Sequence, residues 1–398
     1  MRLVWKQLPL ASNNPTAQKA LKRSSNNLAV VGNKAYVYGG EAKPREPVDD
    51  ELWVVDLDTN SELWVLVCRT AGDVQTASTK LRPSARVGSA LTASGPKLFL
   101  WGGRESKEMT ACNADLWVYD TAATEAGWEC RTVTNDNKDK DVEGAGGCKS
   151  VEERSYHAMA VSGDMLYIHA GCPAVGRSAN LDSLPITSNS TSITTSSLEW
   201  NNHPTAPGPG RGGTVLCPLN LDDKEVLVRY GGFAGHELGS QLDIFHVDID
   251  EWTSIGMPNR EGEEGHPLAR SVHALVPVTS PVQIAGGQGK KILALMLFGE
   301  RGPAPAHLGH AGAGQFHQDA WALIRRDDLV SKENPFGLGF EELEQTGEGD
   351  AEKVPLARGW FAAGWSEVEG QGGKVVVHGG LNDQNERLGD CWVGRIEV

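Results

Sequence analysis

The chain lacks the features that would assign it to nucleic acid or to a membrane. Of its 398 residues, 37 are basic and 52 are acidic, which gives a formal net charge of −15. Nonspecific binding to nucleic acid or to an anionic membrane surface requires a positive field, so this charge argues against both. No run of about eighteen apolar residues is present, and the apolar part of MRLVWKQLPLASNN is too short for a signal peptide. We therefore expect a soluble, cytoplasmic protein.

Several sequence motifs that report chemistry are also missing. The seven cysteines are scattered and form no CxxC pair, so the sequence indicates neither a zinc knuckle nor a disulfide framework. A phosphate-binding GxxxxGK[ST] loop, a GxSxG motif and an HExxH motif are all absent. These absences weaken the interpretation as a nucleotide-binding protein, a serine hydrolase or a zinc protease.

Helical periodicity is scarce, whereas glycine and tryptophan are abundant. The chain has 47 glycines and 12 tryptophans. Short apolar runs bounded by Gly, Pro, Asn and Asp dominate the sequence, a pattern that is typical of β-strands joined by turns. The sequence therefore predicts an all-β chain.

An apolar run that ends at a glycine, in four copies at a glycine pair, recurs six times. The copies are KAYVYGG, KLFLWGG, MLYIHAG, EVLVRYGG, ALMLFGE and KVVVHGG, and they contain Gly40, Gly103, Gly171, Gly232, Gly299 and Gly380. An arginine precedes each copy, and a strand with an aromatic residue follows most of them, as in DELWVVD, ADLWVYD, LDIFHVD, QDAWALI and GDCWVGR; the third copy, LDSLPIT, is degenerate. The six copies in register resemble the kelch repeat over essentially the whole chain.

The repeat count predicts a six-bladed kelch-type β-propeller that forms a single domain over residues 1–398. The last repeat stops at CWVGRIEV and leaves no room for a fourth strand, whereas the opening RLVWKQL reads as an isolated strand. We expect the N-terminal strand to complete the last blade, because this pairing would remove an exposed sheet edge. The tryptophans are predicted to fill the space between blades.

The six arginines are predicted to bind substrate. Each precedes the innermost strand of its blade, near the central channel, and the loops after the glycine pairs should emerge on the same face. Guanidinium groups around a concave mouth can bind a carboxylate or a sulfate in a forked geometry. The predicted substrate-binding residues are Arg23, Arg86, Arg154, Arg211, Arg270 and Arg358, together with Trp360. The alternative is that each arginine caps its own blade through carbonyl oxygens and acidic side chains.

Residues 298–321, FGERGPAPAHLGHAGAGQFHQDAW, contain a concentration of potential metal ligands. Imidazole and carboxylate groups suit Fe(II). Asp319 stands just before Trp321, as Asp115 and Asp390 stand before their own tryptophans, so we assign Asp319 and the neighbouring His317 structural roles. Glu300, His307 and His310 remain as candidate ligands.

A narrower resemblance lies in the same loop. The segments FGE, GHAGAGQF and DAWAL are similar to the corresponding loop of plant specifier proteins, the nitrile-, epithionitrile- and thiocyanate-forming kelch proteins. The resemblance implies action on unstable, sulfate-bearing glucosinolate aglycones, with Fe(II) held by a Glu, an Asp and a His. Glu300 matches the Glu and His310 the His, with a spacing longer by two, while RGPAPAHL offers no Asp. His307 is the candidate replacement for the missing acid.

Two functions follow from these observations. The first is a specifier-like protein that acts on a small anionic molecule by a lyase- or isomerase-type rearrangement at the rim of the channel, with or without Fe(II). The second is a non-catalytic kelch scaffold that binds a protein or peptide at the same rim, because a fold alone does not determine function.

Overall fold

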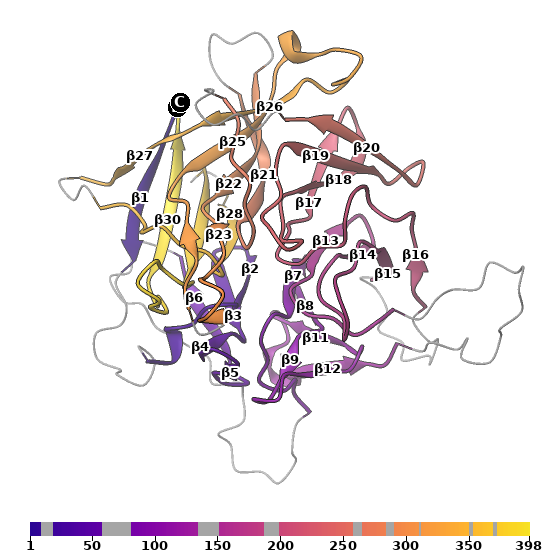
Figure 1. Cartoon of the computed structure of the whole chain (residues 1–398), viewed down its shortest axis with the longest axis vertical. Coiled ribbons are helices and arrows are strands. Elements are labelled where there is room, and N and C mark those ends of the chain that lie inside the picture. The colour runs from indigo at the N-terminus through magenta and orange to yellow at the C-terminus, as the bar shows by residue number, and fades with distance from the viewer. Residues whose placement is uncertain are drawn as a thin grey trace, which may run out of the picture.

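The computed structural model describes residues 1–8, 19–57, 81–133, 151–186, 199–257, 265–283, 290–309, 312–349, 353–368 and 372–398. These residues form six blade sheets around a common centre, as the repeat count predicts (Figure 1). Among the described residues, helical structure is limited to a turn at residues 19–21, the short segments η1 (Thr124–Ala126) and η3 (Asp327–Leu329), and Gly309. Within the same residues, no helix is long and apolar enough to cross a membrane.

The first three blades are antiparallel sheets whose strands follow one another outward from the centre. Blade 1 contains β2 (Asn27–Val31), β3 (Lys34–Tyr38) and β6 (Leu52–Asp56) among the described residues. Blade 2 contains β7 (Ala90–Ser94), β8 (Lys97–Trp101), β11 (Leu116–Asp120) and β12 (Trp128–Arg131). Blade 3 contains β13 (Ala158–Ser162), β14 (Met165–His169), β15 (Leu181–Pro185) and β16 (Asn201–Asn202).

The other three blades repeat this arrangement. Blade 4 contains β17 (Cys217–Leu221), β18 (Lys224–Tyr230), β19 (Gln241–His246) and β20 (Glu251–Gly256). Blade 5 contains β21 (Ala274–Gln283), β22 (Lys291–Leu297), β25 (Ala320–Arg325) and β26 (Leu338–Glu342). Blade 6 contains β28 (Ala362–Val368), β29 (Gly372–His378), β30 (Cys391–Glu397) and β1 (Arg2–Leu8), with β27 (Glu344–Gly347) parallel to β1.

Three two-stranded hairpins form in the loops that follow the glycine turns of blades 1, 2 and 5. They are β4 (Glu41–Lys43) with β5 (Glu46–Pro47), β9 (Arg104–Glu105) with β10 (Thr110–Ala111), and β23 (Glu300–Gly302) with β24 (Gln315–Phe316). The predicted ligand-rich loop of blade 5 is therefore a hairpin whose two arms pair through Glu300 and Phe316.

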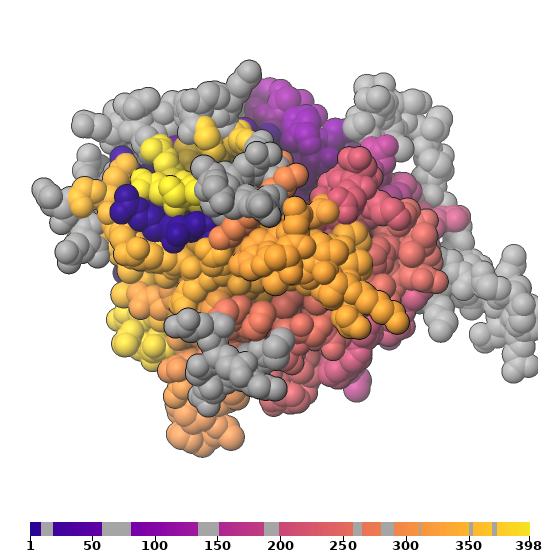
Figure 2. Space-filling model, turned by 90° about the horizontal axis from the view of Figure 1, so that it is seen from above, coloured from indigo at the N-terminus to yellow at the C-terminus, as the bar shows by residue number. Residues whose placement is uncertain are grey.

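The N-terminal strand completes the last blade, which confirms the predicted closure. β1 pairs antiparallel with β30 along its whole length, from Arg2 opposite Glu397 to Leu8 opposite Cys391. Figure 1 shows indigo β1 beside yellow β30, and Figure 2 shows the same first residues from above, flanked by yellow and orange chain. The alternation of buried and exposed residues along β1 places Trp5 inside, where its ring stacks against Phe298 at 6.2 Å. The ends of the chain are thus held in one sheet, and an exposed edge is removed.

The apolar core is divided among the interfaces between blades. The inner strands of neighbouring blades, β2, β7, β13, β17, β21 and β28, contact one another in a closed circle. Six apolar clusters of described residues each join two adjacent blades, as Val228 of blade 4 joins Met296 of blade 5. Most described tryptophans are buried in these clusters, as predicted from their place in the repeat.

The glycine pair turns the chain at the end of the second strand of each blade. At Gly40, φ is +98° and an added Cβ would lie 2.7 Å from the carbonyl oxygen of Ser24, so only glycine fits. In blade 5, the structure shifts the pair by one residue from the expected register. Gly299 (φ +109°) holds the second glycine position and Phe298 (φ +51°) the first. Glu300 is therefore the first residue after the pair rather than part of it.

Candidate functional site

An unusual backbone conformation recurs at the start of all six inner strands. The second residue after each repeat arginine has a φ between +45° and +65°; these residues are Ser25, Gly88, Tyr156, Gly213, Val272 and Trp360. Residues other than glycine adopt this left-handed region rarely, and a β-branched side chain such as that of Val272 is strained there. The surrounding structure must therefore hold these positions in place.

Backbone hydrogen bonds between blades supply that restraint. Five of the six N–H groups donate to the carbonyl oxygen of the equivalent residue in the adjacent blade: Ser25 to Trp360 (2.6 Å), Trp360 to Val272 (3.1 Å), Val272 to Gly213 (2.7 Å), Gly213 to Tyr156 (2.9 Å) and Tyr156 to Gly88 (2.7 Å). The rings of Tyr156 and Trp360 meet edge to face at 5.4 Å across the centre. We call these six residues the floor ring, because five of them line the bottom of a cavity at the mouth of the channel.

A second set of equivalent residues makes the wall of this cavity. The first residue after each glycine pair forms a β-bridge with the residue that follows the arginine of the same blade, as Arg104 does with Val87 and Glu300 with Ser271. We call these six residues the wall residues; they are Glu41, Arg104, Cys172, Phe233, Glu300 and Leu381. All six line the cavity, whose volume is about 650 Å³. The repeat thus places one side chain per blade around the cavity at a fixed offset from its glycine pair.

The six repeat arginines lie inside the blades and do not line the cavity. Their exposed fractions are between 0 and 7 %. The Nη1 atom of each donates to the carbonyl oxygen at the first glycine position of its own blade, over 2.8 to 3.2 Å; the acceptors are Gly39, Gly102, Ala170, Gly231, Phe298 and Gly379. This geometry matches the alternative to substrate binding, in which each arginine caps its own blade through carbonyl oxygens and acidic side chains. Substrate binding by these six residues stays a prediction, but the cations that line the cavity are other residues.

Carboxylates compensate several of these buried charges. Arg270 donates two hydrogen bonds of 2.7 Å to Asp319, whose Oδ2 also accepts from Trp321 Nε1 at 2.8 Å. Arg358 with Asp390 and Trp392, and Arg23 with Asp49 and Trp53, make the same triads. Burial alone would raise the pKa of Asp319, but the hydrogen bonds and charge of Arg270 outweigh it and lower the pKa. The predicted structural role of Asp319 is confirmed.

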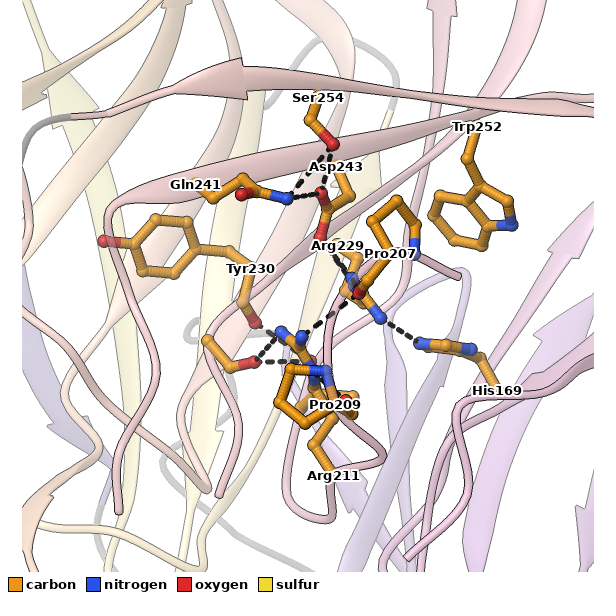
Figure 3. Close-up of polar contacts among 12 residues, drawn as sticks. His169, Pro207, Pro209, Arg211, Arg229, Tyr230, Gln241, Asp243, Trp252 and Ser254 are labelled. Atoms are coloured by element: carbon orange, nitrogen blue, oxygen red, sulfur yellow. Dashed lines mark hydrogen bonds and ion pairs between the residues drawn. The ribbon is translucent and has the colours of Figure 1, made fainter. Parts of the chain in front are cut away.

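Blade 4 uses a different arrangement (Figure 3). Within the described residues, the Arg211 side chain donates only to the carbonyl oxygens of Pro207, Pro209 and Gly231, while a second buried arginine, Arg229, pairs with Asp243. Burial and then the charge of Arg229 lower the pKa of Arg211 to about 10.

The same network reaches into blade 3. His169 Nε2 lies 3.3 Å from Arg229 Nη1, and its Nδ1 lies 2.9 Å from the carbonyl oxygen of Asn180. Burial holds the pKa of His169 well below its usual range, so the neutral ring donates to Asn180 and accepts from Arg229. Since none of its charged groups lines the cavity, the network joins blades 3 and 4 rather than serving a ligand.

Of the three predicted metal ligands, the structure places only Glu300 in the cavity. Its side chain accepts a hydrogen bond of 2.9 Å from Trp360 Nε1 at Oε2 and is 7 % exposed. His307 is exposed on the hairpin loop and does not line the cavity, and His310 lies outside the described residues. Among the described residues, no group of three His, Cys, Asp or Glu side chains is placed to hold a metal ion. The described donors therefore do not make an Fe(II) site by themselves.

Four basic and four acidic residues line the cavity: Arg45, Arg104, Arg177, Arg387, Glu41, Glu108, Glu237 and Glu300. Arg104 in blade 2 donates from Nε to Ser155 Oγ (3.0 Å) and from its Nη atoms to backbone carbonyls, so no carboxylate of the described chain pairs with it. Arg177, on the loop of blade 3, stacks 4.8 Å from the centroid of Phe233 and likewise has no acidic partner there. Between blades 6 and 1, the charge of Arg387 is met by Glu41 at 3.3 Å.

The opposite side of the cavity is acidic. Glu300 in blade 5 and Glu237 in blade 4 both line it, and Glu237 Oε1 is buried with no hydrogen-bond partner among the described residues. Burial, and then the charge of Glu237, raise the pKa of Glu300 to about 7.

Sequence reasoning found Glu300 and Trp360 but missed Arg104, Arg177 and Glu237. The signal for Arg104 was available, since it directly follows its glycine pair as Glu300 does.

Known proteins similar to this chain include kelch-repeat proteins and a sulfolyase. A family model described as the KLHDC2/KLHL20/DRC7 Kelch-repeats domain matches residues 25–287. The N-(sulfonatooxy)prop-2-enimidothioate sulfolyase of Thlaspi arvense is 26 % identical over 387 residues, which cover 93 % of this chain and 91 % of that protein. The Rab9 effector protein with kelch motifs of Xenopus laevis is 37 % identical over 100 residues, covering 25 % of this chain and 23 % of that protein. The solved structure of YjhT, at 10 % identity, has a TM-score of 0.56 over 93 % of each chain.

Proposed function

The chain belongs to the kelch-repeat family represented by the KLHDC2/KLHL20/DRC7 Kelch-repeats domain, and we propose that its cavity binds a small anionic molecule and promotes a lyase-type rearrangement of it. One observation carries the proposal. Two guanidinium groups without a carboxylate partner in the described chain, those of Arg104 and Arg177, line one cavity of a protein with a net charge of −15. The similarity to a sulfolyase along almost the entire chain supports the lyase class.

The two arginines offer complementary ways to hold an anion. Arg104 is oriented by hydrogen bonds to Ser155 and to the carbonyl oxygens of Met109, Cys172 and Pro173, so its positive charge has a fixed place in the wall. Arg177 is exposed and has no hydrogen bond within the described chain, so its planar fork is available for a sulfate or a carboxylate. Positive groups that hold an anionic leaving group stabilise the charge that develops on it as its bond breaks.

The remaining lining suits the body of a small molecule. Trp360 and Tyr156 present aromatic surface from the floor ring, and Val272 and Leu381 add apolar surface. A volume of about 650 Å³ lies within the usual range for small-molecule sites, which is roughly 300 to 1,000 Å³. An association of Fe(II) with Glu300 and His310 stays a prediction, and no step of this proposal depends on it.

Peptide binding at the same rim is the second candidate. Val175 and Leu308 are 89 % and 46 % exposed and lie beside cavity-lining residues, on the loops of blades 3 and 5. Apolar side chains exposed at the mouth of a concave site can serve as anchors for a protein partner. A protein ligand would then contact both the loops and the cavity.

Calorimetric titration with sulfate monoesters and alkanesulfonates tests the proposal. We expect saturable binding to the wild-type protein and a loss of about tenfold or more in affinity for Arg177→Met and for Arg104→Met, since charge-assisted hydrogen bonds contribute about 1.5 to 3 kcal/mol. Arg301→Met is the matched control, because Arg301 is exposed on the blade 5 hairpin and does not line the cavity. The absence of binding by any anionic small molecule would overturn the proposal in favour of the peptide.

A further inference from the structure

The charges of the cavity point to a ligand with two ends. We propose that the cavity takes a dipolar small molecule, with an anionic group against Arg104 and Arg177 and a protonated amine or amidine against Glu237 and Glu300. This inference rests on the proposed function, since the anionic end uses the same two arginines. It adds a recognition site for the other end and so narrows the class of substrate.

The repeat geometry sets the two ends apart. Following the inner strands around the circle, blade 2 lies three steps from blade 5, so these two blades face each other across the axis of a six-bladed propeller. Arg104 and Glu300 are the wall residues of these blades. No ion pair joins them, and each faces the cavity from its own side. Opposite charges that are held apart across a cavity create a field that orients a dipolar molecule.

The acidic side has unused hydrogen-bond acceptors. Glu237 Oε1 is buried without a partner, and the only side-chain hydrogen bond to Glu300 in the described chain comes from Trp360 Nε1. An ionised carboxylate can only accept hydrogen bonds, and a buried oxygen that accepts none is destabilising. A ligand that carries N–H donors would satisfy these oxygens, whereas a second anionic group would be repelled. Burial and the nearby charge of Glu237 raise the pKa of Glu300, and a cationic group bound beside it would lower this pKa.

Four other charged residues line the cavity; two of them, Arg45 and Glu108, are exposed on the turns of the blade 1 and blade 2 hairpins. Glu41 is met by Arg387 at 3.3 Å, so the wall between blades 6 and 1 is close to neutral. The aromatic rings of Tyr156 and Trp360 lie in the floor ring between the two sides. They offer apolar surface to the middle of a ligand and a π face to a cationic end.

The experiment compares a series of ω-aminoalkanesulfonates with alkanesulfonates of the same chain lengths, by calorimetric titration of the full-length protein. We expect at least one aminosulfonate to bind about tenfold or more tightly than its amine-free counterpart. Glu237→Gln should abolish this difference. Arg177→Met should weaken both series. Glu333→Gln is the control, because Glu333 is exposed and does not line the cavity.

The outcomes separate this inference from the proposed function. If alkanesulfonates bind and the amine adds no affinity at any chain length, the dipolar ligand is refuted while anion binding stands. If no sulfonate binds, both proposals fail. If Fe(II) or Mn(II) alone binds, competes with the aminosulfonate and is lost in Glu237→Gln, the acidic side is a metal site and the inference is wrong. Circular dichroism and thermal unfolding of each variant exclude a loss of fold as the cause.

Discussion

Arg104 and Glu300 hold the same place in opposite blades. Each is the first residue after the glycine pair of its repeat, and each forms a β-bridge to the residue that follows the blade's buried arginine. The bridge fixes the backbone, and the side chain then lines the central cavity. One rule of the repeat thus delivers a cation from blade 2 and an acid from blade 5 to a single site. The chemistry of the site depends on the identity of six such residues.

Arg270→Met is expected to lower the free energy of unfolding by about 3 to 5 kcal/mol, because it leaves the largely buried Asp319 without its positive partner. Arg270→Lys should rescue only part of this loss, since an ammonium cannot reproduce the two hydrogen bonds to Asp319 and the bond to Phe298. Urea denaturation measures both. An unfolding free energy within about 0.5 kcal/mol of wild type, as expected for the exposed Arg301→Met, would contradict the capping role.

Acid should destabilise the protein through Asp319 and Asp390. Burial favours the protonated form of each, but Arg270 and Arg358 outweigh burial and lower both pKa values. A carboxyl group whose folded pKa lies below its unfolded value, about 3.9, contributes stability above that value. This contribution is lost as the pH falls through the folded pKa.

The urea midpoint should therefore decrease as the pH is lowered below about 4. Asp319→Asn should be less stable than wild type at neutral pH, because it breaks an ion pair with Arg270, and its midpoint should depend less steeply on pH. Equal pH dependence in the wild type and the variant would show that this triad does not govern acid stability.

Gly213→Ala is expected to destabilise the floor ring. Gly213 has a φ of +60°, and an added Cβ would lie 2.7 Å from Val272 Cγ1. Gly349→Ala is the matched control, since Gly349 has a φ of +69° and open space around its Cα. The control should lose about 1 to 2 kcal/mol from the left-handed conformation, and Gly213→Ala about 1 to 3 kcal/mol more from the clash. Thermal unfolding of both variants measures the difference, and equal losses would argue against tight packing of the ring.

Trp5→Ala should open the closure of the propeller. The Trp5 side chain is 1 % exposed, stacks against Phe298 and donates from Nε1 to Gln345 at 2.9 Å. Removing a buried tryptophan costs about 3 to 5 kcal/mol, and a loosened β1 would expose the edge of β30. We expect a lower urea midpoint and concentration-dependent association in size-exclusion chromatography. Arg2→Ala is the control, because its ion pair with Glu397 is largely exposed to solvent.

The iron prediction has a direct test in metal analysis after anaerobic reconstitution with Fe(II). The resemblance of the blade 5 loop to specifier proteins predicts that wild type retains more iron than a Glu300→Ala/His310→Ala double variant. The iron content of His307→Ala tests the third candidate ligand separately; His307 lies on the exposed part of the hairpin. Equal iron contents in the wild type and the double variant would end the metal hypothesis and leave Glu300 as an acid of the cavity wall.

The sequence by itself determined the strands, the blades and the closure. Six apolar runs that end at a glycine turn, four of them with a glycine pair, and six arginines in register predicted six blades, and RLVWKQL predicted the strand that completes the last one. These features are readable because they are local. Strand periodicity and the restriction of left-handed φ values to a few residue types depend on neighbouring residues. The recurrence of Asp two residues before Trp likewise predicted that Asp319 has a structural role and is not a ligand of the site.

Only the tertiary structure decided which charged side chains face the ligand cavity. An arginine near the channel can point into it or turn into its blade, and the unpaired carbonyl oxygens at the glycine turn favoured the second direction. The blade 5 register, with Phe298 in a glycine position, moved Glu300 into the wall. Arg104, Glu237 and Glu300 come from three different blades, so the segregation of charge across the cavity exists only once the inner strands have closed their circle.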